Sequence, residues 1–184
     1  MAHYRSNHCI GKLLTGTLVF LALFLPEAVL AAPLPVWEFG LRGGMEDAGT
    51  EENYRAGELY LLRALPWQGS VAGGTLATRF DLGVGMLEAI GDRGAWLAAG
   101  GDLVWRPGEW PVELEVGFRP LWLIDHRYGQ DDFGGDMQFA SHVGLSLRIN
   151  PLVMSYRFMH LSNAGLYDEN GGLNLHLFGV GMRF

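Results

Sequence analysis

The sequence nearly lacks cysteine and lysine, and these absences restrict what the protein can do. The single cysteine, Cys9, and the single lysine, Lys12, both lie at the start of the 184-residue chain. The rest of the chain therefore has no thiol for a disulfide, a cysteine-ligated metal or nucleophilic catalysis. Acidic residues outnumber basic ones by 20 to 13, for a formal net charge of −7. This balance argues against nucleic-acid binding, which requires a basic face.

The first 31 residues predict a secretory signal peptide. Two basic residues precede an almost wholly apolar run at 13–25, and small residues at 29–31 suit cleavage. The alternative is a retained membrane anchor, but the apolar run ends at Pro26 and is shorter than the ~20 residues that a spanning helix needs. We therefore expect residues 1–31 to be removed and residues 32–184 to form one domain, too short for a second catalytic module.

No apolar run long enough for a transmembrane helix follows the signal, yet the chain contains 27 glycines and 12% aromatic residues. Apolar and polar residues alternate in about eight segments near the ~10-residue length of barrel strands. This pattern predicts an all-β protein, an eight-stranded antiparallel transmembrane β-barrel of the outer membrane. The expected strands span residues 36–44, 53–65, 72–88, 94–106, 110–123, 136–149, 151–162 and 173–184.

A soluble β-sandwich would alternate as well, so the composition of the polar face is what favours a barrel. In the segment 72–88 this face combines Arg79 and Asp81 with glycines, which suits a narrow lumen filled by side-chain pairs. The opposite, apolar face would meet lipid. The tryptophans fall near expected strand ends, where an aromatic girdle would lie, although core positions would suit them too. They are Trp37, Trp67, Trp96, Trp105, Trp110 and Trp122.

The end of the chain and the loop lengths give the barrel an orientation. The chain stops on Phe184 after apolar residues at alternate positions, which resembles the terminal strand of outer-membrane proteins. Asn150-Pro151 is a very short turn, whereas residues 124–135 and 163–172 form long connections. Because short turns face the periplasm in such barrels, we expect the 163–172 loop at the cell surface, beside the lipopolysaccharide leaflet.

Three polar residues of the last two strands are predicted to share the outer face. In the segment 151–162, the alternate positions that carry the apolar face continue to His160 and Ser162. In the last strand, the alternate apolar positions continue back to Asn174. Since consecutive antiparallel strands are neighbours, the three side chains could meet near the surface of the membrane. A serine hydroxyl becomes nucleophilic when an imidazole takes its proton and a third group orients the imidazole. The residues therefore predict a hydrolase site.

The surrounding loop supplies further candidates. Asn163, Asn170 and the backbone near Gly165 could donate hydrogen bonds to the oxyanion of a tetrahedral intermediate. The structural alternative is that the polar residues of this hairpin only anchor the rim of the barrel. The remaining histidines are interpreted as rim or packing residues without metal-ligand spacing. They include His126, His142 and His176.

The segments 160–166 and 170–174 resemble the C-terminal signature of the PagL-type lipid A 3-O-deacylases, which includes an H-x-S-N-x-G motif. The resemblance is close over about the last twenty-five residues and elsewhere rests on the strand number, the export signal and the terminal phenylalanine. It implies an eight-stranded outer-membrane barrel that hydrolyses the ester at the 3-position of lipid A. On this pattern His160 is the general base and Ser162 the nucleophile.

One position departs from the family pattern. The best-known member has a glutamate as its third catalytic residue, and the matching residue here is Asn174. An asparagine can orient the imidazole, but it carries no charge to stabilise the imidazolium. The alternative third member is a loop carboxylate, Asp168 or Glu169. We favour Asn174 because its position in the strand alternation fits.

The sequence thus predicts a serine esterase, independent of metals and cofactors, that removes a 3-hydroxyacyl chain from the lipid A of lipopolysaccharide. Two other functions remain open. One is a non-enzymatic barrel for adhesion or scaffolding, and the other is an acyltransferase that passes the chain to an acceptor. A homodimer is compatible with the sequence, although nothing in it demands one.

Overall fold

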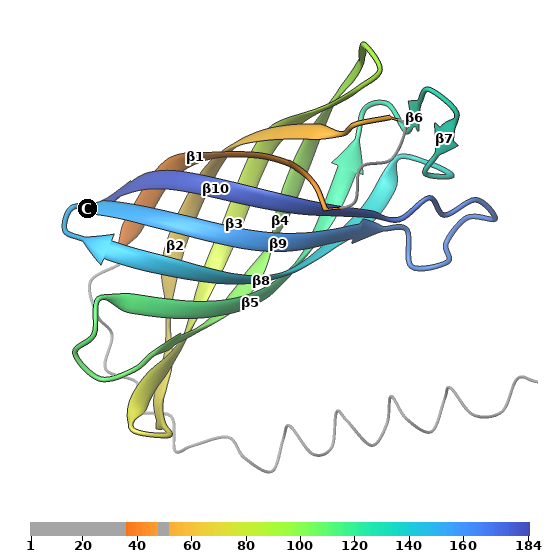
Figure 1. Cartoon of the computed structure of the whole chain (residues 1–184). Coiled ribbons are helices and arrows are strands. Elements are labelled where there is room, and N and C mark those ends of the chain that lie inside the picture. Colours follow the sequence, from red (N-terminus) through yellow and green to blue (C-terminus); the bar gives the residue numbers. More distant parts are fainter. Residues whose placement is uncertain (1–35, 48–51) are drawn as a thin grey trace, which may run out of the picture.

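The chain folds into a closed antiparallel β-barrel, seen in a computed structural model that describes residues 36–47 and 52–184 (Figure 1). The order around the barrel is β1-β10-β9-β8-β5-β4-β3-β2. The strands are β1 (Trp37–Glu46), β2 (Arg55–Val71), β3 (Gly74–Ala89), β4 (Asp92–Arg106), β5 (Val112–Leu123), β8 (Met137–Ile149), β9 (Leu152–Ser162) and β10 (Leu173–Arg183). The predicted eight-stranded barrel is confirmed. The predicted signal peptide lies outside the described residues.

The barrel closes where the first strand meets the last. β1 pairs with β10 from Glu38 opposite Arg183 to Glu46 opposite Leu175. At the very end of the chain, the N–H groups of Trp37 and Phe184 each donate to the other's carbonyl at 2.9 Å. Closure matters because an open sheet edge would leave backbone donors and acceptors unpaired.

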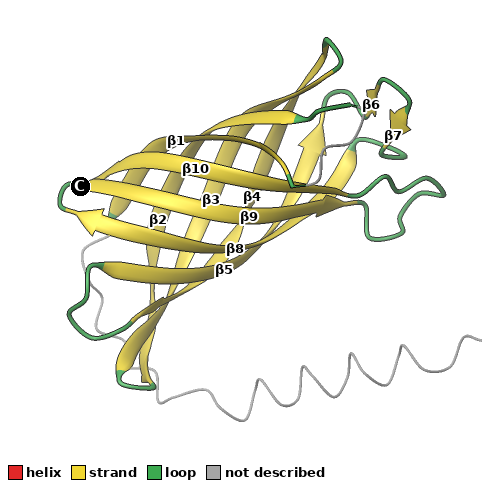
Figure 2. Cartoon of the chain, in the orientation of Figure 1, coloured by secondary structure: helices red, strands yellow, loops and turns green. Residues whose placement is uncertain are grey.

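The long loops gather at one end of the barrel, on the right in Figure 1. There a small hairpin of β6 (Arg127–Tyr128) and β7 (Asp131–Asp132) lies within the connection from β5 to β8. The β9–β10 loop projects from the same end, and Figure 2 shows that strands and loops make up the whole described fold. Among the described residues, no helix is long and apolar enough to cross a membrane.

The outward face of the wall is apolar, as the alternation predicted. Leu41, Val84 and Phe118 are each more than half exposed there.

The tryptophans divide between the two predicted positions, the aromatic girdle and the core. Trp122 is 52% exposed on the outside, whereas Trp96 is only 2% exposed and belongs to the interior. For Trp96 the girdle position is therefore wrong, because its side chain shares a face with the lumen residues.

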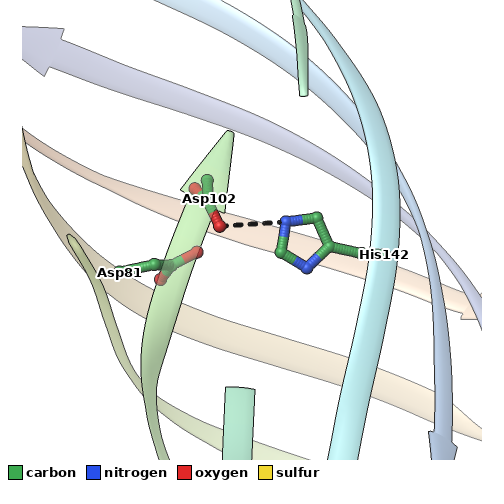
Figure 3. A group of neighbouring side chains, drawn as sticks. All are labelled: Asp81, Asp102 and His142. Atoms are coloured by element: carbon green, nitrogen blue, oxygen red, sulfur yellow. Dashed lines mark ion pairs between the residues drawn. The ribbon is translucent and has the colours of Figure 1, made fainter. Parts of the chain in front are cut away.

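A layer of buried charges fills the middle of the lumen. Arg157 binds Asp81 and Glu115 at 2.8 Å, and His142 faces Asp102 at 3.3 Å (Figure 3). Each charge in this layer is stabilised by opposite neighbours, since an unpaired charge at such depth would be costly. The other members are Glu38, Arg42, Glu58, Arg79, Glu113 and Arg119.

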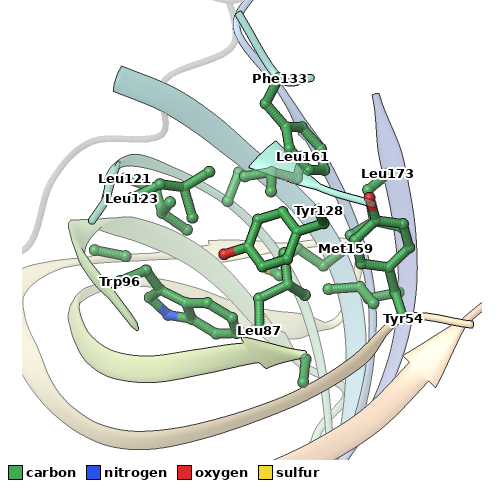
Figure 4. Close-up of a cluster of buried hydrophobic side chains, with 14 of the residues drawn as sticks. Tyr54, Leu87, Trp96, Leu121, Leu123, Tyr128, Phe133, Met159, Leu161 and Leu173 are labelled. Atoms are coloured by element: carbon green, nitrogen blue, oxygen red, sulfur yellow. The ribbon is translucent and has the colours of Figure 1, made fainter. Parts of the chain in front are cut away.

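Above this layer an apolar plug closes the loop end of the lumen (Figure 4). Three rings pack edge to face at its top, with Tyr54 5.8 Å from Tyr128 and 6.0 Å from Phe133 between ring centroids. Leu161 of β9 and Leu173 of β10 join the same cluster from inside the wall. The lumen is therefore filled by side chains, as expected, but it is polar only in part.

Candidate active site

The last hairpin brings two of the predicted site residues into direct contact. His160 of β9 stands opposite Asn174 of β10 in the strand register, and both side chains are exposed on the outer face. His160 Nδ1 lies 2.8 Å from Asn174 Oδ1. Because an amide oxygen only accepts, Nδ1 carries the proton, and the neutral imidazole keeps its lone pair on Nε2. The ring is thus held in the tautomer that a general base requires.

Ser162 ends β9 two positions after His160 and is half-buried. Leu161 between them points inward, so His160 and Ser162 project from the same face of the strand. Among residues 36–47 and 52–184, the structure gives the Ser162 hydroxyl no hydrogen-bond partner. The serine therefore lies on the same strand face as the imidazole, and no hydrogen bond joins the two.

Gly172 lies against the open side of the imidazole. A Cβ at this position would be 3.3 Å from His160 Cε1 and 3.8 Å from Nε2. A side chain here would therefore crowd the edge of the ring that carries the lone pair. The glycine keeps that edge accessible from the 163–172 loop.

Asn163 organises the 163–172 loop rather than facing a substrate. It is fully buried, and its amide nitrogen donates to the carbonyl of Phe133 at 3.0 Å and to that of Glu169. Its Oδ1 accepts the N–H of Gly165 at 2.8 Å. Two of the three predicted oxyanion donors, the Asn163 amide and the Gly165 N–H, are therefore engaged inside the loop in this structure.

Asn170 is the remaining predicted oxyanion donor. Its Oδ1 accepts the N–H of Asn163 at 3.1 Å, which fixes the orientation of the side-chain amide. Within the described part of the chain, its Nδ2 has no acceptor, and the residue is exposed. An oriented amide with unused N–H groups is the kind of donor that an oxyanion hole requires.

The β5–β8 loop supports the 163–172 loop from the side. Tyr167 accepts the N–H of Met137 at 3.3 Å, and a Cβ at Gly134 or Gly135 would collide with the Tyr167 side chain. Asp132 caps the turn of this loop. The Gly134 N–H, and then His126, hold the pKa of the Asp132 carboxyl below its usual value. The candidate site thus rests on two loops locked together.

The loop acids Asp168 and Glu169 lie toward this supporting loop. Both line a hollow together with His126 and Arg127. No hydrogen bond or ion pair joins either carboxylate to His160. Their placement therefore gives no support to Glu169 as the third member of a triad.

Nothing in the sequence indicated a second group of hydrogen-bonded polar side chains on the same face. This second polar chain consists of Asp47, His176 and Tyr156. His176 Nε2 lies 2.8 Å from Asp47 Oδ1, and His176 Nδ1 lies 2.7 Å from the Tyr156 hydroxyl. The His176 ring also packs against Tyr156 and Phe158, with centroids 5.9 and 5.2 Å away. The interpretation of His176 as a packing residue was thus incomplete. Asp47 comes from the opposite end of the sequence, where no local pattern could indicate it.

Comparison with known proteins identifies the family. A family model described as "Lipid A 3-O-deacylase (PagL)" matches residues 37–183. The chain belongs to the PagL family. Its fold also matches a crystal structure of the outer membrane enzyme PagL, with a TM-score of 0.69 and 18% sequence identity. That match covers 79% of this chain and 98% of the other.

A backbone structure of the Yersinia pestis outer membrane protein Ail, in a phospholipid bilayer nanodisc, gives a TM-score of 0.41 at 17% identity. It covers 80% of this chain and 99% of that one. No curated protein sequence matches significantly. Membership of the PagL family, together with the eight-stranded barrel, makes this chain an outer-membrane protein whose apolar outer face meets lipid.

Within residues 36–47 and 52–184, one group of side chains has the geometry of metal ligands. Asp81, Asp102 and His142 offer ligand atoms within 4.8 Å of one another inside the lumen (Figure 3). Both carboxylates already bind arginines, since Asp81 contacts Arg157 at 2.8 Å and Asp102 contacts Arg79 at 2.7 Å. A cation would have to displace these guanidinium groups, so the group fits a role in the charged layer better than metal binding.

Proposed function

We propose that this protein is a serine esterase that removes the ester-linked 3-hydroxyacyl chain at the 3-position of lipid A. The contact between His160 Nδ1 and Asn174 Oδ1 carries the proposal, because it leaves Nε2 as a base on the face that also presents Ser162. Family membership supports lipid A as the substrate. The site would lie in the outer leaflet, where a lipid substrate can reach it by lateral diffusion.

The reaction takes two steps. His160 Nε2 removes the Ser162 proton while the serine oxygen attacks the acyl carbonyl carbon, and the oxyanion accepts hydrogen bonds from the Asn170 amide. The tetrahedral intermediate collapses, the ester C–O bond breaks, and the imidazolium returns the proton to the sugar oxygen. The acyl chain is now bound to Ser162.

Hydrolysis of the acyl-serine repeats the sequence with water as the nucleophile. His160 takes a proton from water, the hydroxide attacks the acyl carbon, and the serine oxygen leaves with a proton from the imidazolium. The products are a free 3-hydroxy fatty acid and a lipid A with a free 3-hydroxyl. Asn174 keeps the imidazole oriented in both steps, and no metal or cofactor takes part.

The barrel purified in detergent micelles and incubated with lipid A tests this proposal. We expect equal amounts of free 3-hydroxy fatty acid and deacylated lipid A, unchanged by a metal chelator. Transfer of the chain to a phospholipid or other acceptor would instead establish an acyltransferase. If no ester is cleaved by a folded barrel, the non-enzymatic function gains support.

A further inference from the structure

Asp47 lies in one row with the proposed base and its orienting amide. The row crosses three neighbouring strands, β9, β10 and β1. His160 stands opposite Asn174, and on the other side of Asn174 the N–H of Asp47 donates to the Asn174 backbone carbonyl at 3.0 Å. Asn174 is therefore held from both sides, by the imidazole at its side chain and by Asp47 at its backbone.

The carboxylate of Asp47 is fixed in place by the second polar chain. His176 Nε2 binds Asp47 Oδ1 at 2.8 Å, and its Nδ1 lies 2.7 Å from the Tyr156 hydroxyl. A neutral imidazole satisfies both contacts, because its Nε2–H donates to Asp47 while Nδ1 accepts from Tyr156. In that arrangement the three side chains together carry one negative charge on the lipid-facing surface.

The loop acids and the lumen acids have other surroundings. The loop acids Asp168 and Glu169 line the hollow shared with His126 and Arg127. The lumen acids, such as Asp81, lie inside the barrel and are compensated by arginines. A polar chain on a surface that faces lipid is costly to maintain, which favours a functional reason for it.

We propose that Asp47 is a positioning residue that supplies the negative charge missing from Asn174. This rests on the proposed esterase function. Two strand spacings place Asp47 roughly 10 Å from His160. At an effective dielectric constant of about 20, a unit negative charge at that distance stabilises the imidazolium that forms in the transition state. The stabilisation corresponds to a roughly tenfold higher kcat. Its N–H also fixes the backbone of Asn174, while His176 and Tyr156 hold the carboxylate.

Moving the charge tests the proposal more sharply than removing it. In micelles with lipid A, Asp47→Asn should lower kcat about tenfold and leave KM within about twofold. The loss should shrink as salt is added, because exposed charges are screened. The double variant Asp47→Asn/Asn174→Asp returns a carboxylate to the row, directly on His160 Nδ1, and should restore kcat at least to the wild-type value.

The controls separate this inference from the proposed function. Asp168→Asn and Glu169→Gln should match the wild type, and the fold of each variant is checked by its heat-modifiable mobility on gels. A kcat of Asp47→Asn within twofold of wild type would overturn the inference. So would a loss that Asn174→Asp leaves unrescued, or a tenfold loss in Glu169→Gln. Each of these results leaves the esterase intact, whereas failure of the wild type to release fatty acid refutes the esterase itself.

Discussion

Three asparagines of the last hairpin have three different structural positions, although they are chemically identical. Asn163 is buried and bonded within the loop, Asn170 is oriented and exposed, and Asn174 contacts the imidazole. What distinguishes them is which of their donors and acceptors the surrounding backbone already uses. Asn170 and Asn174 both keep unused amide N–H groups in the described part of the chain, but Asn174 already orients the imidazole. We therefore assign the Asn170 amide to the oxyanion.

Asn170→Asp tests this assignment. The substitution keeps Oδ1, which accepts the N–H of Asn163, replaces the amide N–H groups with a second oxygen and adds a negative charge. Loss of one oxyanion donor typically lowers kcat by about 10²–10³-fold, and we expect a fall of about a hundredfold, as for Asn170→Ala. Steady-state release of hydroxy fatty acid measures it. Full activity of Asn170→Asp would show that the Asn170 amide does not bind the oxyanion.

Strand periodicity predicted which site residues share a face. It could not predict side-chain partners that come from segments distant in the sequence. A period of two is sufficient to place His160, Ser162 and Asn174 on the outside. The contact of His176 with Asp47 spans 129 positions of sequence and exists only because β1 closes against β10. The engaged state of Asn163 likewise depends on the carbonyl of Phe133 in another loop.

At the scale of elements, the candidate site depends on a clamp between two loops. Asn163 binds the β5–β8 loop through Phe133 and its own loop through Glu169 and Gly165. Tyr167 adds a second point of attachment at Met137. The strand ends position His160 and Asn174, while this clamp positions the Asn170 amide. The catalytic geometry should therefore be more sensitive to the loops than the barrel is.

Asn163→Ala should release the clamp without unfolding the barrel. The substitution leaves the part-buried Glu169 carbonyl and Gly165 N–H without their partner, at up to about 1–3 kcal/mol each. The Phe133 carbonyl keeps its hydrogen bond from the Gln138 amide. We expect faster proteolysis of the loops and loss of most activity, with the heat-modifiable mobility of the barrel unchanged. Limited proteolysis in micelles measures the first effect, with Asp168→Asn as the matched loop control. Protease resistance equal to wild type would contradict the clamp.

The strand boundaries could be predicted closely wherever alternation continues to a clear turn. The expected strand 151–162 is β9, and the expected strand 173–184 is β10 to within a residue. The strand 53–65 was expected to end before Pro66, but β2 continues to Val71 through a register shift between Ala64 and Gln68. A bulge accommodates a proline that cannot donate to the ladder. The two-residue strands β6 and β7 are too short to produce a periodic signal.

At the scale of the whole molecule, the barrel is stabilised from within by a charged layer below an apolar plug. Arg157 lies at the centre of the charged layer, within 2.8 Å of both Asp81 and Glu115. The alternation predicted charges inside the wall, but it could not predict their partners, because these lie on strands across the lumen. The layer gives the outer site a rigid support.

Arg157→Met should destabilise the barrel by about 3–5 kcal/mol, because it removes one of the arginines that compensate the buried carboxylates Asp81 and Glu115. The control is Arg93→Met, which removes an exposed ion pair with Glu88 and should cost less than about 1 kcal/mol. Urea unfolding in micelles, followed by tryptophan fluorescence, measures both. Equal stabilities for the two variants would show that the charged layer does not support the barrel.

The central claim is that Ser162 and His160 hydrolyse an ester of lipid A from the outer face of this barrel. Mass spectrometry of lipid A tests it in cells that express the wild-type chain, His160→Ala or Ser162→Ala, each verified in the outer membrane. We predict loss of one 3-hydroxyacyl mass with the wild type and unchanged lipid A with both variants. Unchanged lipid A with a folded wild-type barrel, or equal deacylation by Ser162→Ala, would contradict it.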